Sequence, residues 1–351
     1  MIVVSQHKMR FSNIELLRIT AMVLVMVLHA DFLSLGSPSA AEVVSAPVQS
    51  FFRIFTESLS IVCVNVFILI SGWFGIRPRL RRFSEFLFQV WFFGVLMYVM
   101  SSLYATVNES GGVRELLKIF VIKDLWFVKA YILLYVFSPL LNLFLDRASK
   151  KNIEVFLLSF YSLQTVHGFF TNSSWFDSGY SPVSFMGLYI LAGYIHRFPD
   201  RWTSQKKYFD IILYLLFALL TTFTAIGMTL WRNDMWTWYK YCAPFTVVEA
   251  VFLLLFFSKL QFNNKFVNWI AISSFAVYLV HTDKNFLHPI YAKFISLWFH
   301  QFGTMQFLLH TVCWIVVLFF ISILIDKLRI FLWTLLTLAY DKVMSKRQIN
   351  R

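Results

Sequence analysis

The sequence predicts an all-α integral membrane protein, with about ten transmembrane helices in one bundle and both termini in the cytoplasm. The chain is 59% hydrophobic and 14% charged, which leaves too little polar surface to cover a water-soluble globule. Apolar runs of about 18 residues or more recur from end to end, and this is roughly the length that crosses a hydrocarbon core. Most Lys and Arg residues lie between these runs.

Ten apolar segments account for the expected spans. In chain order, they cover residues 14–33, 57–76, 84–106, 125–145, 153–170, 183–196, 209–231, 241–258, 267–282 and 304–326. The segment 183–196 is short for a crossing, so we expect it to be tilted, broken or re-entrant. Residues 286–300 are amphipathic and are expected to lie at the membrane interface.

Loop charge orients these spans, because the cytoplasmic loops of membrane proteins are enriched in Lys and Arg. With the N-terminus inside, the cytoplasmic segments hold 21 of the 31 Lys and Arg residues, and the outer segments hold nine. We therefore expect one transmembrane domain over residues 1–351, with spans over about 14–333, a short basic cytoplasmic tail over 334–351 and no appended soluble domain. A cleaved signal peptide is the competing interpretation of the N-terminus, but ionisable residues interrupt its apolar region.

The net charge of +13 does not indicate nucleic-acid binding, because proteins of that class concentrate Lys and Arg on a water-exposed face or arm. Here the basic residues lie between apolar runs, which is typical of membrane topology. The three cysteines lie in separate apolar segments and form no close-spaced metal or redox pattern. We expect the lipid bilayer as a partner, and neither nucleic acid nor metal.

The first span carries the ionisable side chains Glu15, Arg18 and His29. Such groups are expensive inside a membrane, so they usually face the bundle interior and indicate function. At about 100° and 1.5 Å per residue, Arg18 and His29 share one helix face and lie about 16 Å apart along the axis. Glu15 precedes Arg18 by three residues on that face and can form an ion pair with it. His29 has no nearby cation in the sequence and can stay neutral, as a general base requires.

Each of these residues also has a purely structural interpretation. Arg18 can extend toward lipid headgroups at the cytoplasmic end of the span. His29 can be a hydrogen-bonded contact between helices. Asp31 is too close in sequence to share the face of His29, and we expect it at the water-exposed end of the span. The alignment of Arg18 with His29 favours a functional role for the pair.

The segment Asn13-Ile14-Glu15-Leu16-Leu17-Arg18, followed by Leu28-His29, resembles the opening of the acyltransferase-3 family of membrane acyltransferases. This family includes bacterial enzymes that O-acetylate surface polysaccharides. Its members carry an essential arginine and histidine separated by ten residues on the first span, and Arg18 and His29 meet that spacing. Later segments resemble the family in the same order: Phe67 to Trp73, the Arg-x-x-Arg pattern of Arg79 and Arg82, Leu125-Trp126-Phe127 with Tyr131 and Pro139, Gly187 to Tyr194, and Val277 to His281.

The resemblance implies acyl-CoA as a cytoplasmic donor, with acetyl-CoA as the expected form, and an acceptor hydroxyl on the outer side. Arg79 and Arg82 can bind the donor's phosphates, or they belong to an ordinary positive-inside loop. Ser71 can carry the acyl group covalently, but a small residue that permits close helix packing is the interpretation we favour.

Two aromatic pairs are further candidates for the acceptor side. Trp126 and Tyr131 can stack on sugar faces or form an aromatic belt, and we favour the belt. Tyr278 and His281 lie about one turn apart near the outer end of a late span. They can complete a proton path, hold the acceptor, or form an ordinary interfacial pair.

Together, these features predict a multi-pass O-acyltransferase in the cytoplasmic (inner) membrane of a bacterium, with a polysaccharide or glycolipid acceptor and His29 as general base. A proton-coupled flippase or transporter of a lipid-linked glycan is the alternative, because aligned ionisable residues also mark transport paths. A glycan polymerase or ligase is a third class, but the arginines of the outer loops are few and scattered. No motif identifies the acceptor sugar, and Ser71 leaves the question of an acyl-enzyme open.

Overall fold

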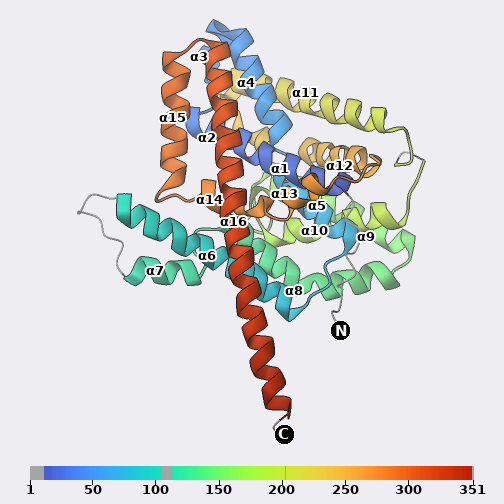
Figure 1. The fold of residues 1–351 in the computed structure, drawn as a ribbon. Helices are drawn as coiled ribbons and strands as arrows, with labels where there is room; N and C mark the ends of the chain where they lie inside the picture. Colours follow the sequence, from blue (N-terminus) through green and yellow to red (C-terminus); the bar gives the residue numbers. More distant parts are fainter. Residues whose placement is uncertain (1–11, 105–112, 202, 350–351) are drawn as a thin grey trace. The chain divides into compact units, whose positions relative to one another are not determined.

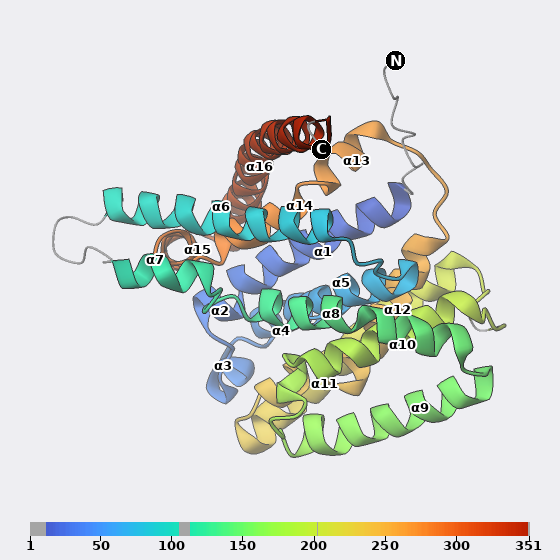
Figure 2. The ribbon, with the colours of Figure 1, turned by 90° about the horizontal axis from the view of Figure 1, so that it is seen from below.

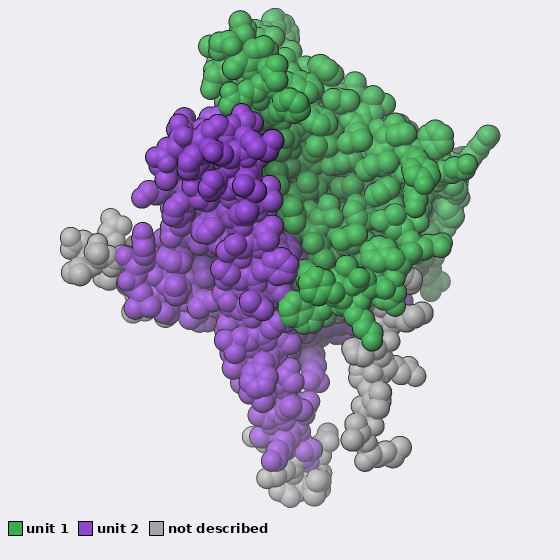
Figure 3. All heavy atoms as spheres, turned by 45° about the horizontal axis from the view of Figure 1, so that its top comes forward, with its two compact units in different colours: residues 1–28, 37–75, 140–272 green, residues 29–36, 76–139, 273–351 purple. Residues whose placement is uncertain are grey.

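The computed structural model describes residues 12–104, 113–201 and 203–349, and within these ranges every regular element is a helix (Figure 1, Figure 2). The all-α prediction is confirmed. The chain forms two compact units, drawn in green and purple in Figure 3. The described parts of the first unit are residues 12–28, 37–75 and most of 140–272, and those of the second are 29–36, 76–104, 113–139 and 273–349.

The first unit contains most of helix α1, the final residues of α8 and a set of helices that belong to it entirely. These are α3 (Ala40–Ser45), α4 (Pro47–Ser60), α5 (Cys63–Phe74), α9 (Lys150–Leu163), α10 (Pro182–Arg197), α11 (Lys207–Arg232), α12 (Pro244–Ser258) and α13 (Lys265–Ala271), with a π-helix at Gln164–Phe170 and 3₁₀ turns at Asp177–Gly179 and Trp236–Tyr239.

The second unit contains the end of α1 (Ser12–Ala30) and most of α8 (Trp126–Arg147). Its own helices are α2 (Phe32–Leu35), α6 (Leu80–Tyr104), α7 (Val113–Phe120), α14 (Ser274–His281), α15 (Leu287–Gln301) and α16 (Thr304–Ile349). Helices α6 and α7 lie side by side (Figure 2). Helix α15 covers most of the amphipathic segment 286–300, whose location at the membrane interface stays a prediction.

Local sequence signals explain where several helices begin. Proline occupies the first helical position of α4, α10 and α12, where its missing N–H has no intrahelical partner to lose. Ser39 and Glu42 form a capping box at the start of α3. The Asn264 side chain accepts from two backbone N–H groups in the first turn of α13. These residues determine where each of these helices starts.

Within the described ranges, six helical segments are long and apolar enough to cross a membrane. They are Ser12–Leu35, Pro47–Phe74, Leu80–Tyr104, Trp126–Arg147, Lys207–Arg232 and Thr304–Ser345. The other four expected spans, at 153–170, 183–196, 241–258 and 267–282, coincide with shorter helices. The count of about ten and the cytoplasmic location of both termini stay predictions, as does the single transmembrane domain. The chain therefore has multi-pass membrane character by its apolar helices.

The Pro47–Phe74 segment is interrupted, because α4 ends at Ser60 and α5 begins at Cys63. The Tyr214 hydroxyl donates to the Leu59 carbonyl at 2.8 Å, next to this interruption. A side chain from α11 thus bonds a main-chain oxygen where the helix is broken, as non-helical backbone at membrane depth requires.

Helices α5 and α10 make a close contact in the first unit. A Cβ atom added to Gly72 would lie 2.3 Å from the main-chain oxygen of Tyr189, so only glycine fits at this position. The Tyr189 hydroxyl donates to Asn142 Oδ1 at 2.7 Å. Glycine therefore sets the separation of these two helices.

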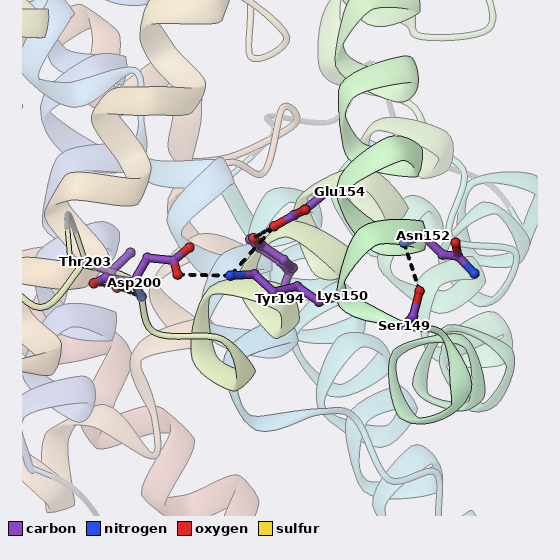
Figure 4. Close-up of polar contacts among 7 residues, drawn as sticks. All are labelled: Ser149, Lys150, Asn152, Glu154, Tyr194, Asp200 and Thr203. Carbon is purple, nitrogen blue, oxygen red and sulfur yellow. Dashed lines mark hydrogen bonds and ion pairs between the residues drawn. The ribbon is translucent and has the colours of Figure 1, made fainter.

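Charged and polar groups tie α9 to the end of α10 and the following loop (Figure 4). Lys150 Nζ lies 3.0 Å from Asp200 Oδ1 and 3.8 Å from Glu154 Oε1. The Tyr194 hydroxyl donates to Glu154 Oε1 at 2.6 Å. The Thr203 hydroxyl bonds the backbone of Asp200, which closes the loop. This network holds one end of the first unit together.

Helix α16 extends beyond the span expected to end at residue 326 and continues to Ile349. Asp326 and Arg329 lie at and just beyond the expected end, and both are buried. Arg329 donates to both Asp326 oxygens at 2.9 and 3.0 Å, and Gln89 of α6 donates to Asp326 at 2.9 Å. Because the charges are paired within the helix, the apolar run after them continues as helix. The described part of the predicted tail 334–351 is helical as well.

Candidate functional site

Helix α1 holds the first group of predicted site residues. Near its start, Ser12 Oγ donates to Asn268 Oδ1 at 2.9 Å, and Asn13 Nδ2 donates to the Phe257 carbonyl at 3.1 Å. One turn later, Arg18 Nη1 lies 3.2 Å from both carboxylate oxygens of Glu15. The predicted ion pair is therefore present. The Glu15 side chain is 9% exposed in this pair, whereas the Arg18 side chain is 37% exposed.

Helix α1 runs without interruption from Ser12 to Ala30, so the step from Arg18 to His29 is helical throughout. His29 lies in the last turn, and the Ser34 hydroxyl donates to its main-chain carbonyl at 2.6 Å. This bond closes the end of the helix at the start of α2. It fixes the backbone from which the His29 ring projects.

The His29 ring lies directly against a second predicted residue, His281 of α14. His29 Nδ1 and His281 Nε2 are 3.0 Å apart, and the ring centroids are 4.9 Å apart. His281 is fully buried, whereas His29 is partly exposed. The structure thus brings together two histidines separated by 252 positions in the chain.

The partners of His281 determine how the protons are arranged in this pair. His281 Nδ1 lies 2.6 Å from the carbonyl oxygen of Val277. A carbonyl only accepts, so Nδ1 of His281 carries a proton, and Nε2 of the neutral ring is an acceptor. His29 Nδ1 must then donate to it, which leaves the lone pair of a neutral His29 on Nε2. The geometry therefore provides His29 with a free basic nitrogen.

A third histidine, His288 of α15, joins the pair. Its ring centroid lies 6.0 Å from that of His29 in a T-shaped arrangement. Nothing in the sequence indicated this contact, because His288 belongs to an amphipathic segment outside the expected spans. Among the described residues, no group of three or more His, Cys, Asp or Glu side chains has an arrangement that would hold a metal ion.

The predicted aromatic residues Tyr131 and Tyr278 lie in one cluster next to this site. Both rings contact Phe127, at centroid distances of 6.0 and 5.7 Å, and Tyr278 also lies 6.5 Å from His281 in a T-shaped arrangement. The Trp126 ring lies 5.9 Å from the ring of Phe127, its neighbour in the chain. The cluster packs beside His281.

Ser71 is engaged in local hydrogen bonding rather than projecting as a free hydroxyl. Its Oγ donates to the Phe67 carbonyl at 3.0 Å, four residues earlier in α5. The next residue, Gly72, makes the close contact with α10. This surrounding is consistent with the packing role that the sequence favoured for the Ser-Gly step.

The side chains of Arg79 and Arg82 extend into solvent at the start of α6 in the second unit. The Tyr135 hydroxyl of α8 accepts from the Arg79 amide at 2.8 Å and donates to the Arg79 carbonyl at 3.1 Å. Within the described part of the chain, we find no ion pair for either guanidinium. A fixed backbone thus presents two arginine side chains that are available to a ligand.

Asp31 and Glu249 are two of the buried acidic residues that were not predicted as such. Asp31 was expected at a water-exposed end, but this prediction is wrong, because the chain turns back at Asp31 into α2 and the residue is only 9% exposed. Glu249 is fully buried in α12, and neither carboxylate oxygen has a hydrogen-bond partner within the described ranges. Its position inside an apolar run was a readable signal.

Comparison with known proteins identifies the chain by one match. A family model described as an acyltransferase domain, that of the acyltransferase-3 family, matches residues 11–327. Searches of curated proteins and of solved structures return no match. The match covers nearly the whole chain and confirms the resemblance found in the first span and the later segments. The chain therefore belongs to the acyltransferase-3 family.

Proposed function

We propose that this protein transfers an acyl group, most simply acetyl, from cytoplasmic acyl-CoA to a hydroxyl of an envelope polysaccharide or a lipid-linked glycan. Family membership supports an acyltransferase, and the apolar helices support a membrane protein. The O-acetyl specificity and a bacterial inner-membrane location are parts of the proposal. Both follow from the family resemblance of the sequence motifs.

The hydrogen-bonded His29–His281 pair is the observation that carries the catalytic part of this proposal. Because His29 Nδ1 donates a hydrogen bond to His281, the lone pair of the neutral His29 ring lies on Nε2, which can act as a base. In the proposed reaction, Nε2 removes the proton of the acceptor hydroxyl while its oxygen attacks the acyl carbonyl. The tetrahedral intermediate then expels the CoA thiolate, which takes the same proton back from His29.

His281 has a supporting role in this reaction. It accepts the hydrogen bond from His29 Nδ1 and so favours the tautomer that the base requires. The resulting imidazolium shares its positive charge across the 3.0 Å contact between the rings. We therefore assign His281 as a positioning residue and His29 as the general base.

Arginine side chains are the proposed contacts of the donor. The exposed guanidiniums of Arg79 and Arg82 can make charge-assisted, bidentate bonds to the phosphates of acyl-CoA. The clamp from Tyr135 to the Arg79 backbone limits how far this turn can move. Arg18, held by Glu15 in the first half of α1, is proposed to contact the donor further along its length.

Labelled acetyl-CoA added to membranes tests this function directly. Removal of a general base lowers the rate by about 10²- to 10⁴-fold, so His29→Ala should nearly abolish label in glycan. Arg18→Ala should also reduce it. His300→Ala, which removes an exposed histidine of α15, is the matched control and should behave as wild type. Equal incorporation in all four proteins would refute the proposal.

A proton-coupled glycan transporter is the second candidate, and two observations favour keeping it. The Pro47–Phe74 segment is broken in its middle, and the same unit holds the buried carboxyl group of Glu249, which has no hydrogen-bond partner among the described residues. Both features occur at intramembrane transport sites. A transporter predicts that Glu249→Gln stops glycan movement and that the protein incorporates no acetyl label.

A further inference from the structure

We propose that a cavity in the second unit binds the acceptor through a sugar that carries an anionic group, either phosphate or carboxylate. This inference rests on the proposed acyl transfer and names the acceptor class. The cavity has a volume of about 310 Å³. Its lining comes from α6, α7, the segment that joins α7 to α8, and the end of α14.

Cationic side chains dominate the charge of this cavity. Lys118, Lys123 and Lys284 line it, against Asp124 and Asp283. Within the described residues, no carboxylate forms an ion pair with Lys123 or Lys284, so both ammonium groups can contact a ligand. Lysine is a common point-charge contact for phosphate. The excess of ammonium groups therefore favours an anion.

The two carboxylates add a second chemical requirement. Asp283 Oδ1 already accepts from the backbone amides of Asn285 and Phe286, at 3.2 and 2.8 Å. Burial raises the pKa of Asp283, and the two backbone amides occupy acceptor sites of its carboxylate. Asp124 is exposed and is a good acceptor for sugar hydroxyls. An anionic ligand rich in hydroxyl groups satisfies both sets of residues.

The rest of the lining and the volume limit the size of this ligand. Val90, Ile119 and Leu279 supply an apolar wall, which suits the C–H face of a pyranose ring. Small-molecule sites usually occupy roughly 300–1,000 Å³, so this cavity lies at the lower end of that range. It accommodates one sugar with its charged substituent rather than a long segment of polysaccharide.

The position of the cavity on α14 connects it to the proposed base. Thr282 and Asp283 line the cavity and directly follow His281 in the chain. His281 contacts His29 at 3.0 Å. The Thr282 hydroxyl donates to the Tyr278 carbonyl at 2.6 Å, which fixes the end of the helix. The end of one helix thus carries both the positioning histidine and a wall of the cavity.

Direct binding to the purified full-length protein, without acyl-CoA, tests the inference. The probes are glucose 1-phosphate, glucuronic acid, neutral glucose and a polyprenyl-phosphate-linked glucose. Lys123→Gln and Lys284→Gln should each weaken binding of the anionic probes about tenfold, as expected for loss of one charge-assisted hydrogen bond. Lys293→Gln removes an exposed lysine of α15 outside the cavity and should bind as wild type.

Preference of the wild-type protein for the anionic sugars, with loss in the two cavity variants only, would support the inference. The lipid-linked and free phosphates differ in their carrier, so the tighter one identifies the source of the acceptor. Equal affinity for glucose and glucose 1-phosphate, or no effect of the cavity lysines, would overturn it. Because no acyl group is supplied, this result is independent of the acetyl-transfer assay that tests the proposed function.

Discussion

Replacement of His281 by phenylalanine should slow acyl transfer about tenfold without changing the affinity for the donor. Phenylalanine retains an aromatic ring in a fully buried position but cannot accept a hydrogen bond from His29 Nδ1. One hydrogen bond contributes about 0.5–1.5 kcal/mol net, which corresponds to roughly 2- to 13-fold in rate. The rate falls because His29 is no longer held in the tautomer that leaves Nε2 free.

Initial rates of label transfer, measured over a series of acetyl-CoA concentrations, separate kcat from KM. His281→Gln should recover part of kcat, because its amide can accept from His29 and donate to the Val277 carbonyl. The matched control is His310→Phe, since His310 Nδ1 also lies close to a carbonyl four residues earlier, that of Gln306 at 2.7 Å. A folded His281→Phe protein with unchanged kcat would refute the assignment.

Four further substitutions test the donor contacts and the packing. Gly72→Ala should destabilise the purified protein by about 1–3 kcal/mol through its clash with α10, whereas Gly227→Ala, with open space around it, should stabilise it by up to about 1 kcal/mol. Thermal unfolding in detergent measures both, and equal effects would contradict the close contact. Arg329→Ala should lower stability by about 3–5 kcal/mol, because it leaves the buried Asp326 carboxylate without its cation. Arg79→Gln should leave the unfolding temperature unchanged but raise KM for acetyl-CoA about tenfold, and an unchanged KM would exclude Arg79 from the donor site.

The sequence predicted the features that depend on local spacing. Helical periodicity was sufficient to place Glu15 beside Arg18 and to align Arg18 with His29 on one helix. Composition was sufficient for the all-α membrane class. The motif order from Arg18 to His281 was sufficient for the family, because segments that are weak singly follow one another in the family's order along the chain.

Contacts between distant segments were outside the reach of such reasoning. Both His29 and His281 were candidates, but nothing in their local sequence indicates that their rings meet. His288 was missed because it lies in a segment without an expected role. The last helix continues well past residue 326, and the pairing of Asp326 with Arg329 inside it depends on burial that the sequence alone does not reveal.

The hydrogen bond from His281 to Val277 has a consequence for how mutations can affect this protein. The two hydrogen bonds that link His29 to His281 and His281 to Val277 end on a main-chain carbonyl. The donor and acceptor in each bond are therefore set by the backbone and not by a third side chain. A screen for inactive variants should therefore recover changes at His29 and His281, whereas apolar residues of similar size should be accepted at position 277, which is fully buried. Only a change in the backbone itself, such as an ester in place of the amide between Val277 and Tyr278, would weaken that acceptor. The position of a main-chain carbonyl thus determines which nitrogen of His29 is basic.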